Sequence, residues 1–527
     1  MTGRLVVAGQ TPGRQSQKIQ LYQGEKLRLV APWLVFAFAL SLNFWSVWRS
    51  GFDGLYGQDP YSYFAHAVEL YTRQSLFHHW QWETTARLLY WPFGYPGLLA
   101  LVFYLTGPTP GAAQLSSLLC WAAVAGLVTA IGQNLLVNHN LTGPAAGLMV
   151  ALSPLGRQAA ISIMADAAAL FWTSLGLWLA LKIKPSGVVI TAKLNYLYAA
   201  GAGMAMGLAG ITRYAALTAL PLLPLILARQ AGGGRKRAFI MLGLAFGLAA
   251  LVYLPQFIIN QLYPDSFWTD SWLADWSPLN AFQTSFTTRD GFAAYGMPPL
   301  LFYLVYPLIN LHFLTAGILL LCGAGLLTLW RVESRFVLFL LLLWWVLPVT
   351  AFSGIPYESE RFSLTFLPPL ALLAGSGADS LGRWFRLKPK QWKVAGAGLA
   401  GFSVVGLLLV SQHHLDGFMA VKANDLATAR QVEEQLPAQA TLITFDLSLT
   451  FDHYTRLKIR DLWFLDGPEI NNLVNSQPAV YLLADPQKMA NQWADNHVGK
   501  AYTLALTRKV GPPLAEFGNF WLWRLAR

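Results

Sequence analysis

Residues 158–183, QAAISIMADAAALFWTSLGLWLALKI, decide the fold of this chain. The stretch is apolar along its whole length and has only Asp166 and Lys182 as charged side chains. A helix needs about 20 apolar residues to cross a bilayer, whereas a membrane strand alternates apolar and polar residues. The continuous run therefore predicts a transmembrane helix, with an acid near one end and a lysine at the other.

The whole composition agrees with this reading. Of the 527 residues, 55% are hydrophobic and only 12% are charged, and the mean hydropathy is +0.42. Soluble proteins carry about 25% charged residues. Both cysteines, Cys120 and Cys322, lie in apolar runs, so neither a disulfide framework nor a metal cluster is indicated. The sequence predicts a polytopic membrane protein built of helices.

Twelve apolar segments are candidate helices. They lie at about 31–49, 91–107, 111–137, 142–156, 158–183, 194–211, 214–229, 237–260, 311–330, 335–353, 362–381 and 393–411. The first thirty residues are polar and basic, which is not typical of a cleavable signal peptide.

Basic residues indicate the orientation of these helices. Residues 1–411 hold 26 basic and 14 acidic residues, whereas 412–527 hold 11 and 12. Since basic loops stay in the cytoplasm, this excess indicates orientation rather than nucleic-acid binding. Five groups are predicted to be cytoplasmic: Arg4, Arg14, Lys18, Lys26 and Arg28; Lys182, Lys184 and Lys193; Arg229, Arg235, Lys236 and Arg237; Arg331 and Arg335; Arg383, Arg386, Lys388, Lys390 and Lys393.

The number of crossings follows from these groups. One of the four segments between 91 and 183 cannot span, because Lys182 must be cytoplasmic. Segment 91–107 is short and begins with two prolines and two glycines, which favours a helix along the outer surface; 142–156 is the alternative. About eleven spans result, and Asp166 lies near the outer face in either case.

The predicted fold is an all-α polytopic membrane domain followed by a small α/β domain. Residues 1–30 form a cytoplasmic tail, 31–411 the membrane domain with external loops 50–110 and 261–310, and 412–527 the external domain. In the last part, ATLITFD (440–446), AVYLLAD (479–485) and FWLWRLA (520–526) are typical of strands. Segments 427–436 and 486–495 are typical of helices between them.

Four charged residues share the predicted outer face: Asp59, Asp166, Arg213 and Arg361. Ionisable groups at a membrane edge are costly and tend to mark function. A carboxylate can take a proton from a hydroxyl, and arginine binds phosphate through two charge-assisted bonds. The set therefore suits a reaction between a hydroxyl and a phosphate ester.

Each of these residues also has a purely structural interpretation. Asp59 and Pro60 form a good turn or helix start, and Asp166 suits the positive end of a helix dipole. The two arginines could anchor the protein at lipid headgroups. In the same way, Trp268, Trp272 and Trp276 recur every four residues, which predicts an amphipathic surface helix, either a membrane anchor or the wall of a lipid entrance.

The order of five motifs carries a resemblance to a known superfamily. They are GQDPYSYFAHAVEL (57–70), WPFGYPGLLALVFYL (91–105), ALSPLGRQAAISIMADAAALFW (151–172), ITRYAALTALPLLPLIL (211–227) and ERFSLTFLPPLALLAG (360–375). This order resembles the GT-C superfamily of membrane glycosyltransferases. Within it, the chain is similar to the dolichyl-phosphate-mannose mannosyltransferase and aminoarabinose transferase group.

The resemblance implies an inverting transfer of a sugar from a polyprenyl-phosphate donor to a hydroxyl of a glycan, lipid or protein. The reaction would occur at the outer face of a bacterial inner membrane, among membrane lipids. It implies the following roles: Asp59 and Asp166 catalytic; Arg361 and Arg213 bound to the donor phosphate; Tyr61, His66 and Glu360 as candidate substrate contacts. The sequence shows no cluster of residues with metal-ligand spacing, although two acids could hold a divalent cation.

Two other classes of protein remain as alternatives. A transporter or flippase for an anionic lipid would use the outer arginines as headgroup ligands, with broken helices and paired halves. A non-catalytic membrane subunit would depend on 412–527 and tolerate loss of Asp59.

Overall fold

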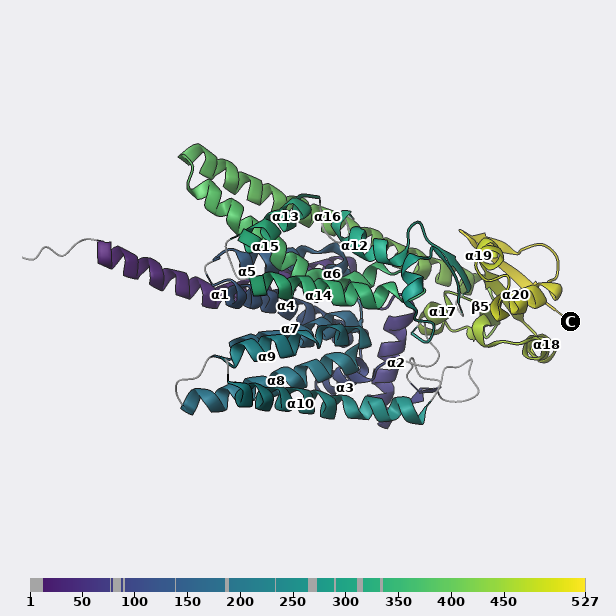
Figure 1. Ribbon diagram of the computed structural model, residues 1–527. Helices are drawn as coiled ribbons and strands as arrows, with labels where there is room; N and C mark the ends of the chain where they lie inside the picture. Colours follow the sequence, from purple (N-terminus) through teal and green to yellow (C-terminus); the bar gives the residue numbers. More distant parts are fainter. Residues whose placement is uncertain are drawn as a thin grey trace, which may run out of the picture.

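The computed structural model describes residues 13–75, 77–78, 87–88, 91–137, 139–184, 189–232, 234–263, 273–288, 291–309, 316–331 and 335–526. A bundle of helices makes up most of the chain, and a mixed sheet with its own helices lies beyond one end of the bundle (Figure 1). The predicted Arg4, Trp268 and Trp272 lie outside the described residues.

The bundle is built of α-helices of different lengths, several of them long and apolar. Its helices are α1 (Gly13–Ser50), α2 (Gln58–Arg73), α3 (Gly94–Thr106), α4 (Pro110–Leu135), α5 (Thr142–Leu152), α6 (Pro154–Ile161), α7 (Ala165–Lys182), α8 (Val189–Thr212), α9 (Leu222–Gln230), α10 (Arg235–Leu262), α12 (Pro299–Ile309), α13 (Ala316–Arg331), α14 (Arg335–Ser353), α15 (Leu367–Arg386) and α16 (Lys390–Gln435). Short 3-10 helices lie at η1 (Tyr214–Ala219), η2 (Pro278–Phe282) and η3 (Glu360–Phe366).

Five described helices are long and apolar enough to cross a membrane, and a sixth crossing results if α6 and α7 count as one bent span. Several shorter apolar helices, among them α3 and α5, accompany them. A mostly helical membrane architecture is confirmed, and the number of eleven spans stays a prediction. Two short antiparallel pairs, β1 (Phe77–His78) with β2 (Arg87–Leu88) and β3 (Ser285–Thr288) with β4 (Gly291–Ala294), lie between the helices.

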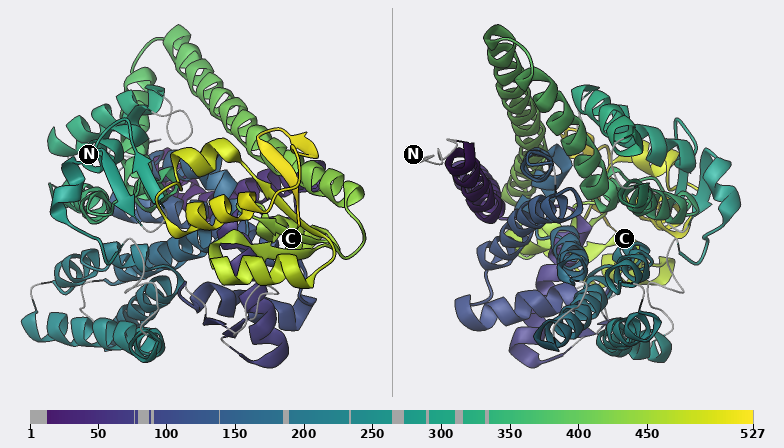
Figure 2. Two further views of the ribbon diagram at one scale, coloured as in Figure 1. Left: turned by 90° about the vertical axis from the view of Figure 1, so that its right-hand side faces the viewer. Right: turned by 60° about the vertical axis from the view of Figure 1, so that its left-hand side comes forward.

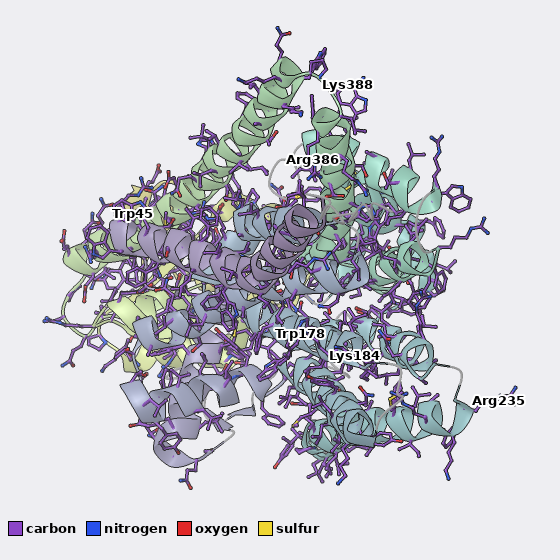
Figure 3. All side chains as sticks on the ribbon, turned by 90° about the vertical axis from the view of Figure 1, so that its left-hand side faces the viewer. Trp45, Trp178, Lys184, Arg235, Arg386 and Lys388 are labelled. Carbon is purple, nitrogen blue, oxygen red and sulfur yellow. The ribbon has the colours of Figure 1, made fainter. Side chains whose placement is uncertain are left out.

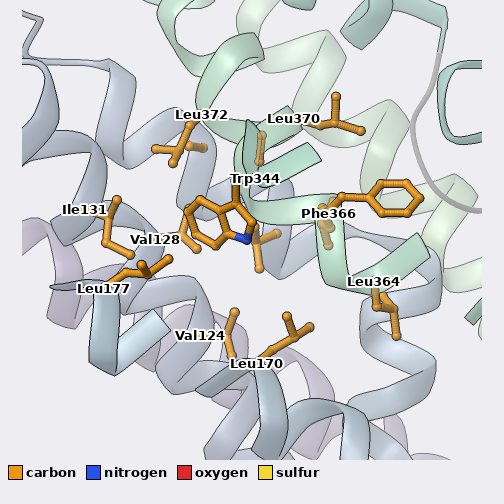
Figure 4. Packing of buried hydrophobic residues seen from close by; sticks show 14 of the residues in the cluster. Val124, Val128, Ile131, Leu170, Leu177, Trp344, Leu364, Phe366, Leu370 and Leu372 are labelled. Atoms are coloured by element: carbon orange, nitrogen blue, oxygen red, sulfur yellow. The ribbon is translucent and has the colours of Figure 1, made fainter. Parts of the chain in front are cut away.

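The bundle core lies where α4, α7, α14 and α15 meet. Figure 4 shows the indole of Trp344 on α14 among aliphatic side chains of the other helices, including Val128, Leu170 and Leu372. In a membrane, such close packing rather than exclusion of water holds helices together. The core fixes α7 beside α15, and therefore sets where Asp166 lies relative to the segment before α15.

The helix predicted over 158–183 is wrong as one continuous element. It is divided into α6 and α7, which meet at 110°. The amide of Gln114 donates to Phe52 O and Ile161 O at 3.0 and 2.6 Å, and Ile163 N donates to Gly54 O at 3.0 Å. These bonds satisfy the backbone groups that the break leaves open.

The loop between α1 and α2, whose Gly54 O accepts from Ile163 N, depends on a glycine. Gly54 has a φ of +86°, and a Cβ there would lie 2.8 Å from the Ile163 side chain. Only glycine fits this conformation and this space.

The C-terminal part forms a five-stranded sheet in the order β6-β5-β7-β9-β8. β5 (Thr441–Thr444) pairs in parallel with β6 (Lys458–Asp461) and β7 (Val480–Ala484), whereas β9 (Phe520–Leu525) is antiparallel to β7 and β8 (Ala515–Phe517). Helices α17 (Ser448–Tyr454), α18 (Gly467–Ser476), α19 (Pro486–Asn491) and α20 (His497–Thr507) accompany the strands. The three predicted strands lie at β5, β7 and β9; β6 and β8 were not predicted.

Both faces of this sheet are covered. Ile443 belongs to an apolar cluster with residues of α18 and α20, and Leu442 belongs to another with Ala429 and Val432 of α16. Strands buried on both faces read as continuous apolar runs. This explains why β5 and β7 show no alternation in the sequence.

Helix α16 connects the two parts of the molecule without a break. It has 46 residues, which corresponds to about 69 Å. The predicted span at 393–411 and the predicted helix at 427–436 are therefore sections of one helix.

Several of the basic residues predicted to be cytoplasmic lie at the end of the bundle away from the sheet (Figure 1 and Figure 3). Arg237 donates to Lys184 O at 2.8 Å, and Arg28 donates to Asn140 at 3.1 Å. Figure 3 views this end and labels Lys184, Arg235, Arg386 and Lys388, and Figure 2 shows the sheet on the opposite side. Three of the predicted cytoplasmic groups therefore share one end of the bundle.

Asp461, at the end of β6, provides a test of the sheet. Its carboxylate accepts from Trp463 N at 2.8 Å, yet burial raises the pKa of Asp461 to about 6. The folded state therefore retains the proton between about pH 4 and 6 while the unfolded state loses it. The free energy of unfolding therefore falls as the pH rises from about 4 to 6, and above about pH 6 this loss of stability is complete.

We expect Asp461→Asn to raise the stability of the full-length protein by about 1 kcal/mol at pH 7.5 and to remove this pH dependence. Thermal unfolding in detergent at pH 4.5 and 7.5 measures both effects. Asp466→Asn is the control, because Asp466 is an exposed N-cap where asparagine serves equally well. A loss of stability at pH 7.5 in Asp461→Asn would contradict the assignment.

Candidate active site

The four charged residues predicted for the outer face meet in one cluster. Arg361 Nη2 lies 2.7 Å from Asp59 Oδ2, and Arg361 Nε lies 3.1 Å from Asp166 Oδ2. The guanidinium of Arg213 contacts the other oxygen of Asp166. They come from α2, α7, the start of η1 and the start of η3, so only the tertiary fold brings them together.

Both acids lie in the first turn of a helix. Asp59 follows Gly57, whose φ of +74° ends the preceding loop and starts α2. Asp166 is the second residue of α7, directly after the break. The positive end of a helix dipole favours a carboxylate at such a position. The structural interpretation of each acid as a helix-start residue is thus compatible with a chemical role.

The two acids hold both arginines, and an aromatic side chain also holds Arg213. Arg213 is extended between α8 and η1, and its guanidinium lies 5.6 Å from the ring centre of Phe362. Phe362 in turn stacks on Phe352 at 5.0 Å. Arg361 therefore contacts the acids, and its neighbour Phe362 supports Arg213.

The exposure of these side chains separates their roles. Asp166 is 4% exposed, and each of its oxygens faces an arginine. Asp59 is 15% exposed, and within the described part of the chain its Oδ1 has no hydrogen-bond partner. Arg361 is 30% exposed. Asp59 and Arg361 can therefore reach a substrate, whereas Asp166 orients the two guanidinium groups.

Tyr63 is a fifth residue of this cluster that the sequence analysis missed. It lies one turn after Asp59 on α2, is buried, and packs edge-on against Tyr95 at 5.1 Å. Burial raises the pKa of Tyr63, and its hydroxyl interacts electrostatically with all four charged residues. It therefore stays protonated and can donate. Its spacing of four residues from Asp59 was the available signal.

The three candidate substrate contacts lie in different places. The hydroxyl of Tyr61 contacts Lys422 at 2.7 Å, in a separate cluster. The ring of His66 bonds the carbonyl of Ser62 on its own helix at 2.7 Å. Glu360 begins η3, directly beside Arg361. Glu360 thus adjoins Arg361 in the chain, Tyr61 belongs to the cluster around Lys422, and the described bond of His66 stays within α2.

A pocket opens beside Asp166 and Arg213. It is small, with a cavity volume of about 20 Å³, and lies between α7, η1 and η3. Its wall is mostly apolar, with side chains such as Leu170, Ala219 and Leu364. The charged cluster therefore borders an apolar space inside the bundle.

Arg361 lies between the two carboxylates. A divalent cation that bridged Asp59 and Asp166 would have to displace its guanidinium. Within the described ranges, His, Cys, Asp and Glu do not gather in threes as a metal site would require. In the described part of the chain, the guanidinium of Arg361 is thus the positive group that both acids contact.

A family model matches most of the membrane part of the chain. The model of the Alg9-like mannosyltransferase family matches residues 61–444, which is more than half of the chain. The chain belongs to the Alg9-like mannosyltransferase family. The predicted GT-C membrane glycosyltransferase is thereby confirmed. None of the curated proteins matches this mannosyltransferase-family chain.

Solved structures share the fold of this family member. ArnT from Cupriavidus metallidurans bound to undecaprenyl phosphate has a TM-score of 0.60 at 15% identity, and the match covers 93% of this chain and 97% of that one. The Archaeoglobus fulgidus oligosaccharyltransferase in its apo form has a TM-score of 0.59 at 13% identity, with 91% and 71% covered. At such identities the likeness shows the shared fold.

Proposed function

We propose that this glycosyltransferase moves a sugar from a polyprenyl-phosphate-linked donor to an acceptor hydroxyl. The observation that carries the proposal is Arg361, which contacts both Asp59 and Asp166 and is still partly exposed. An arginine fixed by two acids is preorganised to bind a phosphate with its remaining N–H groups. The similar ArnT structure contains undecaprenyl phosphate, which supports a lipid phosphate here.

The proposed reaction is a direct displacement. Asp59 takes the proton of the acceptor hydroxyl, whose oxygen attacks the anomeric carbon of the donor sugar. The bond between that carbon and the phosphate oxygen breaks, and the lipid phosphate leaves with the electron pair. Arg361 and Arg213 stabilise its charge. Attack from the opposite side inverts the anomeric configuration, and the acceptor is a glycan, lipid or protein.

The proposed site faces the outside of a bacterial inner membrane. The basic end of the bundle is then cytoplasmic, as the distribution of Lys and Arg indicates. Residues 412–527 form a periplasmic α/β domain on this proposal, and about eleven crossings connect the two sides. Membrane lipids surround the bundle.

The transporter alternative predicted broken helices, and the described chain has one such break, between α6 and α7. Hydrogen bonds from Gln114 and to Gly54 hold this break closed, and it turns Asp166 toward the arginines. The break thus serves the charged cluster. Family membership also favours transfer chemistry over transport and over a non-catalytic subunit.

The test is a transfer assay with the purified full-length protein. Labelled polyprenyl-phosphate sugars, mannose among them, are compared with the corresponding nucleotide sugars. We expect transfer from the lipid-linked donors alone, and a product whose anomeric configuration, measured by NMR, is inverted. Transfer from nucleotide sugars, or a retained configuration, would contradict the proposal.

A further inference from the structure

A buried lysine joins α2 to the C-terminal part of the chain. Lys422 on α16 is 3% exposed. Its ammonium group donates to Leu55 O, to Tyr61 Oη at 2.7 Å and to Tyr454 Oη at 3.3 Å. These three acceptors account for all three N–H bonds of the ammonium group.

No carboxylate is among these acceptors. Two acids act on the ammonium only electrostatically: Asp53, which accepts from the hydroxyl of Tyr454, and Asp425 on α16. The ammonium also lies 5.1 and 4.5 Å from the ring centres of Tyr61 and Tyr454. A buried charge without a direct ion pair is expensive, and an apolar side chain would pack this position at lower cost. The lysine therefore needs an explanation beyond packing.

The acceptors of Lys422 lie on either side of Asp59. Leu55 precedes α2, and Tyr61 is two residues after Asp59 in its first turn. Tyr61 Oη also lies 3.3 Å from Thr450 Oγ1 on α17. The segment that begins α2 is thus fastened to α16 and α17 by directional bonds.

We propose that Lys422 is a positioning residue, which fixes the first turn of α2 and thereby Asp59 relative to the donor site. The proposal rests on the proposed function of Asp59 as the base. A displacement of a catalytic group by about 1 Å can cost up to 10²-fold in rate. The link also joins the C-terminal sheet to the base, because α16 continues into the core of that sheet.

Anchoring of α16 does not explain the lysine. Arg157 on α6 is buried and donates to Asn43 on α1 at 3.0 Å and to Ser411 on α16 at 3.1 Å. Arg49 on α1 pairs with Asp416 on α16 at 2.5 Å. These bonds hold α16 against the bundle without touching α2, so the contribution of Lys422 is directed at α2.

The test compares Lys422→Met, whose unbranched side chain is one atom shorter and cannot donate, with Arg49→Met as a matched control. Both changes remove one tie of α16 to the bundle, and only the first reaches α2. We expect Lys422→Met to lower kcat about 10- to 100-fold with donor KM within about twofold. Tyr61→Phe, which removes one acceptor, should lower kcat less. Arg49→Met should leave both constants unchanged.

Hydrogen exchange gives a readout that does not depend on activity. In Lys422→Met, the amides of residues 61–63 should exchange at least about tenfold faster than in the wild type, but not in Arg49→Met. Unchanged exchange and unchanged kcat in folded Lys422→Met would overturn the proposal, as would a rise in donor KM without a fall in kcat. If the wild type transfers no sugar, the proposed function fails, and the exchange measurement still decides the link.

Discussion

Replacing Asp59 by Asn is expected to lower kcat by about 10²- to 10⁴-fold, the usual contribution of a general base. The amide has the same shape and can still accept from Arg361 through its oxygen, but it cannot take a proton. Donor KM should change little, since Arg361 and Arg213 remain in place. Transfer of labelled sugar by purified protein at saturating donor measures the effect.

The matched control for this variant is Glu69→Gln on the same helix. Glu69 forms an ion pair with Arg73, 3.5 Å away, toward the far end of α2. We expect near wild-type transfer from Glu69→Gln. Asp59→Asn that folds normally and retains more than about half of the wild-type kcat would show that Asp59 is not the base.

The second large effect is expected for Arg361→Lys. Lysine has all its donors on one nitrogen, so it cannot reproduce the spread of Arg361, whose Nη2 and Nε contact different carboxylates and whose Nη1 is left for a phosphate. We expect donor KM to rise about 10- to 100-fold, with a smaller fall in kcat caused by the poorer orientation of Asp59. Initial rates over a range of donor concentrations separate the two constants.

Arg229→Lys serves as the control for Arg361→Lys. Its guanidinium lies 4.2 Å from the ring centre of Phe336, away from the charged cluster. Its kinetic constants should stay near those of the wild type. If Arg361→Lys lowers kcat and leaves donor KM unchanged, then Arg361 orients Asp59 but does not bind the donor phosphate.

The fold class could be predicted because its signals are local. Continuous apolar runs identify membrane helices, and a strand such as VYLLA (480–484) is apolar along its whole length because both faces of the sheet are covered. The break at residues 162–164 could not be predicted in this way. It depends on Gln114 and Gly54, which are far away in the sequence and contact it only in the folded bundle.

For the site as well, the choice of residues could be predicted from the sequence, and their contacts could not. Asp59, Asp166, Arg213 and Arg361 could be selected because charges are rare in such a chain, and orientation placed them on one face. Their pairing could not be predicted, because each belongs to a different element. Tyr61 and Tyr63 illustrate the limit: both tyrosines lie next to Asp59 in the sequence. The turn of α2 directs one toward Lys422 and the other toward the charged cluster.

Helix α16 gives the molecule a mechanical property. One rod of about 69 Å begins among the lipid-facing helices and ends in the hydrophobic core of the sheet. A tilt of a few degrees at its membrane end moves the other end by several ångströms, because an unbroken helix acts as a lever. A helix can adapt to bilayer thickness by tilting, within the limits that its packing against neighbouring helices sets. The lipid environment therefore has a direct geometric route to the position of the sheet.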